Sequence, residues 1–473
     1  MKFLLIYPDF CFGSRGKYYE GAAIISAMLK QAGHKVSFLH LNTKVSADYI
    51  CDAIKENSPD LIGFSSTSHM FFYIAECAKV IKKKFNIPII CGGKHPTLCP
   101  DSAISEEGLD MICVGEGEYA IVELCDSLEH GKDIDKILNI WVKKSDGTIA
   151  KNEIRPLVED LSSLPLPDRG IFNEDNFLES DRERINVLAI RGCPYDCTYC
   201  SNQALRKIYA KKGRYIRRKS IDYILEEINL GLKKNPKAKY VNFNDDILAL
   251  DKNWFKDLVY AHKARYNLPY ECNAKFDLID EEIVNIFKDT GCQMLSFGLE
   301  SGNDYIRNKV LNRKMTKAEM VKAAGLCKCA GIKIFTYNMV GIPEERLADI
   351  LDTVKLNANI EPIDIHVSVF APYRGTALYD KCMKEGSIKG SNFLKGSYFE
   401  QPVLELKGLK PQEIEFAVKN FGNFFRYYIQ LKKIPSFLKP LFGKMLDILW
   451  LKPNLYIYLM GIRLSLKRKE TIS

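Results

Sequence analysis

The hydrophobic residues of the first 145 positions form short apolar runs separated by longer amphipathic stretches. The apolar runs predict strands at 2–7, 36–41, 60–65, 87–91 and 111–114. The amphipathic stretches predict helices at 18–32, 47–56, 71–85 and 119–128. This alternation is typical of a parallel sheet covered by helices on both faces. Ligands of such a sheet bind beyond the carboxyl ends of its strands.

Small and polar residues follow the strands of this first block. They are Ser65, Ser66 and Thr67, then Gly92, Gly93 and His95, and then Gly115, Glu116 and Gly117. Glycine allows a bulky ligand to approach the backbone closely. A dinucleotide site is not expected, because only Gly13 and Gly16 follow the first strand and the Gly-x-Gly-x-x-Gly pattern is absent.

The pattern changes between 139 and 166 and then alternates again. Ser145-Asp146-Gly147 indicates a hairpin, and the prolines of Leu164-Pro165-Leu166-Pro167 disfavour a helix. Beyond this predicted linker, strands are expected at 184–190, 240–243, 270–274, 294–298, 332–339 and 365–370. Helices are expected between them at 221–233, 254–265, 280–288, 317–330 and 348–357.

Three cysteines carry the most specific chemistry in the chain. Cys193, Cys197 and Cys200 have the spacing Cys-x3-Cys-x2-Cys, and no further cysteine or histidine follows before His262. A cubane iron–sulfur cluster held by three thiolates keeps one iron open to a substrate or cofactor. Structural zinc generally takes four protein ligands. The spacing therefore favours an open cluster, while a zinc site and buried free thiols stay as alternatives.

The cysteine run resembles the cluster motif of the radical S-adenosylmethionine enzymes, with the aromatic residue Tyr199 before the last cysteine. The resemblance implies a 4Fe–4S cluster whose open iron binds the amino and carboxylate groups of S-adenosylmethionine. It implies reductive cleavage to a 5′-deoxyadenosyl radical, with an electron donor such as flavodoxin or ferredoxin. It also implies a partial (β/α)6 TIM-type barrel for the second block, with the chemistry at the carboxyl ends of its strands.

Two further runs resemble the cobalamin-linked class of that family. Asn242-Phe243-Asn244-Asp245-Asp246 resembles its Phe-x-Asp-Asp strand end, and Gly298-Leu299-Glu300-Ser301-Gly302 resembles its Gly-x-Glu-Ser-Gly element. The resemblance implies that S-adenosylmethionine contacts Tyr199, Asn244, Asp245, Gly298, Glu300 and Ser301. The alternative for the aspartates is a helix cap before Trp254. No residue is assigned a catalytic role.

The first block resembles the Rossmann-like cobalamin-binding domain of the same class. The resemblance implies cobalamin contacts from Ser65, Ser66, Thr67, Gly92, Gly93, His95, Gly115, Glu116 and Gly117. The Asp-x-His-x-x-Gly run that supplies a histidine to cobalt is absent. Cobalt is therefore expected to lack that histidine, and the alternative is a domain that has kept the fold and lost the cofactor.

Charge is concentrated at the carboxyl end of the chain. Residues 421–473 contain ten Lys or Arg and two acids, while the whole chain carries a net charge of +9. Apolar groups beside basic flanks indicate either peripheral membrane contact through 421–473 or a cap packed on the barrel. Nucleic-acid binding is not expected, because no RNA-binding module accompanies the charge. The 15 cysteines and the lack of a secretory leader predict a cytoplasmic protein with reduced thiols.

The combined expectation is an α/β chain of four parts. They are a cobalamin-binding domain at 1–145, a linker at 146–180, a radical barrel at 181–378 and a basic, mainly helical region at 379–473. The expected activity is methylation of an unactivated carbon, or of phosphorus, in a small-molecule or lipid-like substrate. The alternatives are oxidative cyclisation or rearrangement without methyl transfer, an RNA-modifying methylthiotransferase, and a non-enzymatic sensor.

Overall fold

The computed structural model describes residues 1–10, 17–388 and 402–460, so Gly13 and Gly16 lie outside it. A seven-stranded sheet occupies the first part of the chain, in the order β2-β1-β3-β4-β5-β6-β7. Its strands are β1 (Lys2–Pro8), β2 (Lys35–Leu41), β3 (Leu61–Ser65), β4 (Ile89–Gly92), β5 (Met111–Cys113), β6 (Ile140–Lys143) and β7 (Ile149–Lys151). The first five strands are parallel, as the alternating pattern predicts.

The hairpin predicted at Asp146-Gly147 is confirmed, and it belongs to this sheet. The amide of Lys144 donates to the carbonyl of Thr148 over 2.8 Å, and β6 pairs antiparallel with both β5 and β7. The first sheet therefore continues past residue 145, because β7 pairs with β6 and forms the last strand of the sheet.

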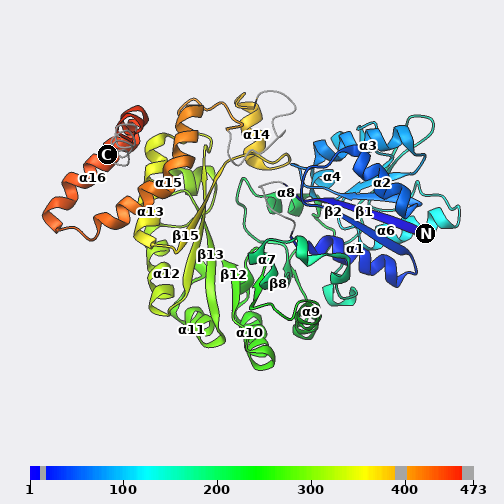
Figure 1. Ribbon diagram of the computed structural model, residues 1–473, viewed down its shortest axis with the longest axis horizontal. Helices are drawn as coiled ribbons and strands as arrows, with labels where there is room; N and C mark the ends of the chain where they lie inside the picture. The colour runs from blue at the N-terminus through cyan, green and yellow to red at the C-terminus, as the bar shows by residue number, and fades with distance from the viewer. Residues whose placement is uncertain (11–16, 389–401, 461–473) are drawn as a thin grey trace, which may run out of the picture.

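Helices cover both faces of the first sheet (Figure 1). They are α1 (Glu20–Gln31), α2 (Ala47–Asn57), α3 (Phe71–Lys84), α4 (Lys94–Leu98), α5 (Pro100–Ile104) and α6 (Glu118–Glu129). Apolar residues of α1 and α6 share one core with the sheet, and those of α2 and α3 share another. The short helices α4 and α5 occupy a segment for which the sequence pattern predicts no helix.

The segment after the hairpin packs against α1 instead of spanning open space. It contains η1 (Leu161–Ser163), η2 (Arg169–Ile171), η3 (Glu174–Asn176) and α7 (Glu179–Arg182). The Asp168 carboxylate accepts hydrogen bonds of 2.6 Å from both Ser26 and Lys30. The Arg169 guanidinium is buried and forms an ion pair with Glu227 at 3.2 Å. These polar contacts attach the first sheet to the second unit.

The second sheet has six parallel strands that lie side by side in chain order. They are β8 (Arg184–Val187), β11 (Tyr240–Phe243), β12 (Tyr270–Ala274), β13 (Cys292–Glu300), β14 (Lys333–Val340) and β15 (Asp364–Val369). The predicted strand at 184–190 is shorter, since the chain leaves the sheet after Val187. It then forms β9 (Ile190–Arg191), which pairs antiparallel with β10 (Arg217–Arg218).

Helices follow the strands of the second sheet and complete the partial barrel. They are α8 (Ser201–Ile208), α9 (Ile221–Lys234), α10 (Lys252–Tyr266), α11 (Glu281–Thr290), α12 (Lys317–Cys329), α13 (Leu347–Ile360) and α14 (Ala377–Lys384). Short turns are formed by η4 (Leu248–Leu250), η5 (Phe276–Leu278) and η6 (Ile306–Val310). Side chains of Ser220, Asp251, Asp280 and Thr316 cap α9, α10, α11 and α12, which explains where these helices begin.

The carboxyl-terminal region is helical, with α15 (Pro411–Leu431), η7 (Ser436–Leu438) and α16 (Lys439–Leu451). Its apolar residues share a core with α13 and β15. Figure 1 shows α16 at the end of the molecule opposite the first sheet. The predicted fold class is confirmed: a Rossmann-like domain, a partial barrel and a helical extension. Within the described residues, none of the helices combines the length and the apolar character that crossing a bilayer requires.

Candidate cofactor-binding site

A cavity of about 520 Å³ lies between the carboxyl edge of the first sheet and the barrel. Predicted cobalamin contacts that line it are Ser65, Gly92, Gly93, Gly115, Glu116 and Gly117. From the barrel side it is lined by Gly192 beside the cysteines, Asn202, Asn244 and Asp246. The cavity therefore brings the first-sheet motifs and the cysteine loop to one space.

The glycines of the first sheet keep this cavity open in two different ways. A Cβ atom at Gly92 would lie 3.6 Å from its nearest neighbour, and one at Gly117 would lie 3.4 Å away. Larger side chains at these two positions would fill the cavity without a backbone clash. At Gly93 the φ of +98° and a distance of 2.7 Å from a Cβ to the Ser66 carbonyl require glycine for the backbone itself.

The deep part of the cavity is apolar and lies between the first sheet and helices α1 and α6. Leu5, Ala22, Ile25, Ile90 and Ile121 line it. The combination of an apolar recess and a glycine-lined mouth fits a large planar cofactor that carries a tail. No histidine is among the described residues that line the cavity, in agreement with the absence of the cobalt-ligand motif.

Three of the predicted cobalamin contacts lie outside the cavity lining. The His95 ring stacks on Phe71 with centroids 3.9 Å apart, and its Nδ1 lies 3.1 Å from the Ser68 hydroxyl. Burial lowers the pKa of His95 to about 4. Ser66 is buried, and its hydroxyl donates to the carbonyl of Thr67 over 2.9 Å. These three residues support the loop that presents Ser65 and Gly93.

Glu116 joins the two units at the mouth of the cavity. Its carboxylate accepts hydrogen bonds from Arg191 at 3.1 Å and from Arg217 at 2.7 Å. Burial raises the pKa of Glu116, but the hydrogen bond from Arg217 and the charge of Arg191 outweigh it and leave the pKa below its ordinary value. Since Arg191 and Arg217 belong to β9 and β10, these ion pairs fix the strand that enters the cysteine loop.

The cysteine loop connects β9 to α8. Gly192 begins it with a φ of +94°, and a Cβ there would lie 2.5 Å from the Tyr215 carbonyl. Asn202 Nδ2 lies 3.8 Å from Cys200 Sγ, and Arg313 Nη1 lies 4.0 Å from Cys197 Sγ. Such N–H groups directed at thiolates are typical of cluster sites and tune their potential. The donor set therefore fits an iron–sulfur cluster.

The cysteine sulfur atoms are not grouped as ligands of a single ion. Burial raises the pKa of the Cys193 thiol to about 12, so metal binding must displace the proton. Among the described residues, one set of three potential ligands has its ligand atoms within 4.8 Å of one another, and it consists of His34, Asp126 and Glu129. The three cysteines do not form such a set. A tetrahedral zinc ion would require such close spacing from its thiolates, and a cluster of several irons would not.

A buried charge cluster stands beside the cysteines at the end of β13. Arg313 donates to the Tyr199 hydroxyl and to the Gly298 carbonyl, each over 2.6 Å, and lies 3.7 Å from Glu300. Glu300 has a φ of +63°, which is unusual for a residue with a side chain and is typical of functional sites. Burial raises the pKa of Glu300, while Arg313 and Tyr199 oppose that shift.

Two features of this charge cluster differ from the motif-based expectation. No sequence motif identifies Arg313, because only the folding of the chain brings it next to Tyr199 and Glu300. A Cβ at Gly298 would lie 2.5 Å from Glu300 Oε1, so this glycine makes room for the carboxylate. The Ser301 hydroxyl is buried and accepts the amide of Asn303 at 3.3 Å, which makes it a local cap.

Asp245 and Asp246 have opposite environments. Asp245 is fully buried, lies outside the cavity lining and accepts the amide of Ile190 at 2.5 Å. Burial raises its pKa to about 8, against the opposing effect of that amide. Asp246 is exposed, lines the cavity and accepts from Asn202 at 2.9 Å. The cavity-facing carboxylate is thus Asp246, while Asp245 supports β9; the cap of α10 comes from Asp251.

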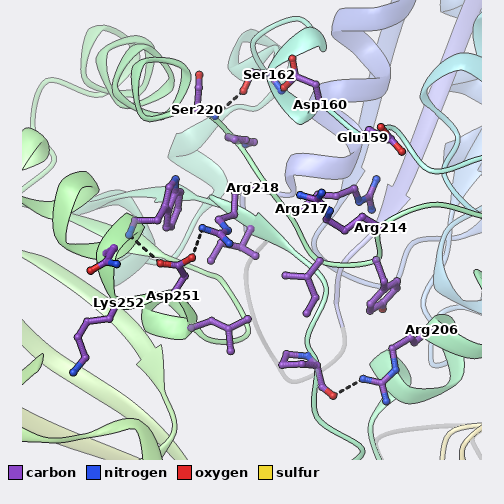
Figure 2. Close-up of a pocket in the computed structure, with 18 residues that line it drawn as sticks. Glu159, Asp160, Ser162, Arg206, Arg214, Arg217, Arg218, Ser220, Asp251 and Lys252 are labelled. Carbon is purple, nitrogen blue, oxygen red and sulfur yellow. Dashed lines mark hydrogen bonds and ion pairs between the residues drawn. The ribbon is translucent and has the colours of Figure 1, made fainter.

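A second depression, of about 1180 Å³, lies on the other side of β9 and β10. Figure 2 shows Arg206, Arg214, Arg218 and Lys252 around it. Pro194 of the cysteine loop also lines it. Residues 206–219 contain eight Lys or Arg and no acid. We call this depression the basic groove. It borders the cysteine loop at Pro194 and is separate from the cavity.

Comparisons with known proteins agree with this arrangement. The B12 binding domain family matches residues 20–125, and the radical SAM superfamily matches residues 187–356. An uncharacterized methyltransferase of Pyrococcus horikoshii is 24% identical over 83% of this chain and 84% of its own length. The anaerobic magnesium-protoporphyrin IX monomethyl ester cyclase of Rubrivivax gelatinosus is 23% identical over 90% of this chain and 77% of its own.

Solved structures share the fold. The radical S-adenosylmethionine methyltransferase TsrM from Kitasatospora setae, bound to tryptophan and a SAM analogue, has a TM-score of 0.68 at 15% identity. The similarity covers 85% of this chain and 80% of that protein. Since both family matches coincide with the two units that enclose the cavity, this chain belongs to the cobalamin-binding radical S-adenosylmethionine enzymes, which use a 4Fe–4S cluster, S-adenosylmethionine and cobalamin.

Proposed function

We propose that this enzyme methylates an unactivated carbon, or phosphorus, of a small-molecule or lipid-like substrate. The observation that carries the proposal is the shared cavity, because Gly92 and Gly117 from the first sheet and Gly192 and Asp246 from the barrel line the same space. When bound, the cluster supplies the electron that cleaves S-adenosylmethionine, and cobalamin supplies a methyl carrier. A shared cavity allows both reactions to reach one substrate.

The residues of the chain have distinct positioning roles in this proposal. Cys193, Cys197 and Cys200 hold the cluster. Glu300 and Tyr199, held by Arg313, present fixed polar groups next to it, where S-adenosylmethionine would bind. Because Arg313 already pairs with both groups, little reorganisation is needed when the ligand arrives.

The methylthiotransferase alternative needs a second set of cluster cysteines in the first part of the chain. Cys91 lies in β4, Cys113 in β5, Cys125 in α6 and Cys99 between α4 and α5. All four are buried, and burial raises the pKa of the Cys113 and Cys125 thiols to about 12. Protonated thiols spread through an apolar core favour packing over metal binding, which leaves the single cluster of the main proposal.

The experiment separates methyl transfer from cyclisation or rearrangement. The anaerobically reconstituted protein is incubated with S-adenosylmethionine, a reductant and extracts of candidate substrates, and the nucleoside products are quantified. The proposal predicts both S-adenosylhomocysteine and 5′-deoxyadenosine, together with a substrate heavier by one methylene. Formation of 5′-deoxyadenosine alone would support cyclisation or rearrangement, and formation of neither would contradict both.

We also propose that the basic groove receives the electron donor, a small acidic protein of the flavodoxin or ferredoxin type. The groove borders Pro194, next to the cluster ligand Cys193. Its lining carries six basic and three acidic residues, so it complements a negatively charged partner. Transient redox complexes use small surfaces, and charge complementarity speeds their formation.

A further inference from the structure

A second surface, far from the cavity, carries an unusual concentration of exposed apolar side chains. It lies on residues 432–460, which we call the C-terminal hairpin. This segment contains the connection that follows α15, then η7, α16 and the helical residues 453–460. The exposed fractions are 78% for Phe437, 67% for Leu441 and 68% for Tyr458. Further exposed apolar members are Phe442, Met445, Ile448, Leu451, Leu455, Ile457 and Leu459.

One face of α16 accounts for the packing of this helix on the protein. Trp450 is fully buried, its indole N–H donates to the Leu347 carbonyl at 2.9 Å, and its ring meets Phe424 edge-on at 4.9 Å. Asp447 pairs with Lys355 at 2.7 Å. These contacts anchor the hairpin, so the exposure of its other face is not a result of poor docking.

The outer face of α16 is also largely apolar. Leu441, Met445, Ile448 and Leu451 all lie on it and are exposed. A helix that is apolar all round is normally buried on all sides. Contiguous apolar patches on a protein surface generally mark an interaction site. The outer face of the hairpin therefore has the character of an interaction site.

The charge beside the patch indicates which partner. Lys433, Lys444 and Lys452 are exposed, and none of them forms an ion pair within the described residues. In the sequence alone, residues 461–473 contain four basic residues and one acid. A twofold dimer through this face would bring two copies of the same lysine-bearing surface together, and such a like-charge juxtaposition is unfavourable. An anionic lipid surface accepts both the apolar groups and the lysines.

We propose that the outer face of the C-terminal hairpin binds the surface of an anionic membrane. Phe437, Leu441 and Tyr458 insert between the head groups, and the lysines contact the lipid phosphates. Binding of this kind is reversible and does not require a membrane-spanning helix. Its position at the end of the molecule opposite the first sheet (Figure 1) leaves the cavity free, and it is independent of the proposed reaction.

The test uses the full chain and sedimentation with vesicles of phosphatidylcholine, with or without phosphatidylglycerol. We expect binding to the anionic vesicles that weakens as salt is added, and little binding to pure phosphatidylcholine. Replacing three patch residues, Phe437→Ser, Leu441→Ser and Ile457→Ser, should weaken binding by about tenfold or more. The matched control is Val321→Ser, Ile363→Ser and Met383→Ser, which alters exposed apolar residues elsewhere and should leave binding unchanged.

Charge reversal provides a second arm. Lys444→Glu with Lys452→Glu should weaken binding to anionic vesicles about tenfold, whereas Lys233→Glu with Lys237→Glu on the barrel should not. Far-UV circular dichroism and iron content verify that each variant is folded. Lack of binding of the wild type to anionic vesicles at low salt would overturn the proposal. A wild-type dimer that the patch variants convert to a monomer would also overturn it and assign the patch to a second copy.

Discussion

The glycine-lined side of the central cavity and the charge cluster beside the cysteines use opposite means to define a site. On the first-sheet wall, Gly92 and Gly117 leave space that side chains would fill. On the barrel side, Tyr199, Glu300 and Arg313 form a set of buried, mutually paired polar groups beside the cysteine loop, outside the cavity lining; we call this set the barrel wall. The first wall is suited to accept a bulky ligand by shape. The second is suited to hold charge in a fixed position, and it stores strain in the backbone of Glu300.

This difference explains why the two walls should respond differently to substitution. A side chain added to the glycine wall obstructs a ligand but leaves the protein core intact. A charge removed from the barrel wall leaves its buried partner unpaired, which destabilises the folded protein itself. Substitutions in the two walls should therefore separate these two responses.

The largest effect is expected at the cluster. Cys197→Ala removes one of three thiolate ligands and should abolish iron incorporation and cleavage of S-adenosylmethionine, because only two thiolates of the loop would be left to hold the cluster. Iron content and the low-temperature EPR spectrum of the reduced protein provide the measurement. The control is Cys329→Ala, an exposed cysteine on α12, which should retain iron. Full iron content in Cys197→Ala would contradict the ligand assignment.

The barrel wall should depend on charge pairing. Arg313→Met leaves the Glu300 carboxylate buried without its cation and should lower the free energy of unfolding by about 3–5 kcal/mol. Denaturant titration measures this change. The double variant Arg313→Met with Glu300→Gln should recover a large part of the loss, since the unpaired charge is then gone. Equal stability of the single and double variants would show that the two side chains are not coupled.

The glycine wall should depend on space. Gly92→Leu fills the cavity without forcing the backbone and should weaken cobalamin binding by about tenfold or more, as an overpacked site costs about 1–3 kcal/mol. Iron content should stay at the wild-type level. Cobalamin retained after gel filtration, measured by its visible absorbance, checks this expectation. Unaltered retention would place the cofactor elsewhere.

Asp245 should give stability a distinct dependence on pH. Its pKa is about 8 in the folded protein and close to 3.8 when unfolded, so folding favours the protonated form. The stabilisation is complete below about pH 4 and is lost as the pH rises through 8. Relative to Asp245→Asn, the wild type should lose up to about 1.4 kcal/mol per pH unit over this range. The measurement is the free energy of unfolding of both proteins at pH 5 and pH 8. The same difference between wild type and Asp245→Asn at the two pH values would contradict a protonated Asp245.

The smallest effect is expected in the basic groove. Arg214→Glu with Arg218→Glu should slow cluster reduction by an acidic donor several-fold at low salt, and the difference should shrink as salt screens the charges. Stopped-flow absorbance follows the reduction, with dithionite as a donor that needs no docking. Lys237→Glu on the barrel surface is the control. Equal slowing with dithionite would assign the effect to the cluster and not to docking.

Local patterns predicted much of this molecule. The bounds of β11 and β12 agree with the predicted strands, because alternating burial repeats every two residues along them. The cysteine spacing is local as well, and so is the hairpin at Asp146-Gly147. The split of the predicted strand at 184–190 was not predictable, because the buried Asp245 and strand β10 determine it through the fold.

The site residues that were missed depend on long-range contacts. Arg313 lies 114 positions from Tyr199 along the chain, yet donates to its hydroxyl. The motif around Asn244 identifies the right strand end but cannot tell which aspartate faces the cavity. His95 follows two cavity-lining glycines, but the ring of Phe71 covers it. Burial, which depends on neighbours distant in sequence, decides each of these cases.

The central claim is that one cavity serves a cluster on the barrel wall and cobalamin on the glycine wall. The most direct test determines iron and cobalamin in anaerobically reconstituted wild type, Cys197→Ala and Gly92→Leu. The wild type should contain about four irons and one cobalamin per chain, Cys197→Ala should lose iron but keep cobalamin, and Gly92→Leu should do the reverse. Zinc in place of iron, or loss of both cofactors from both variants, would contradict the account.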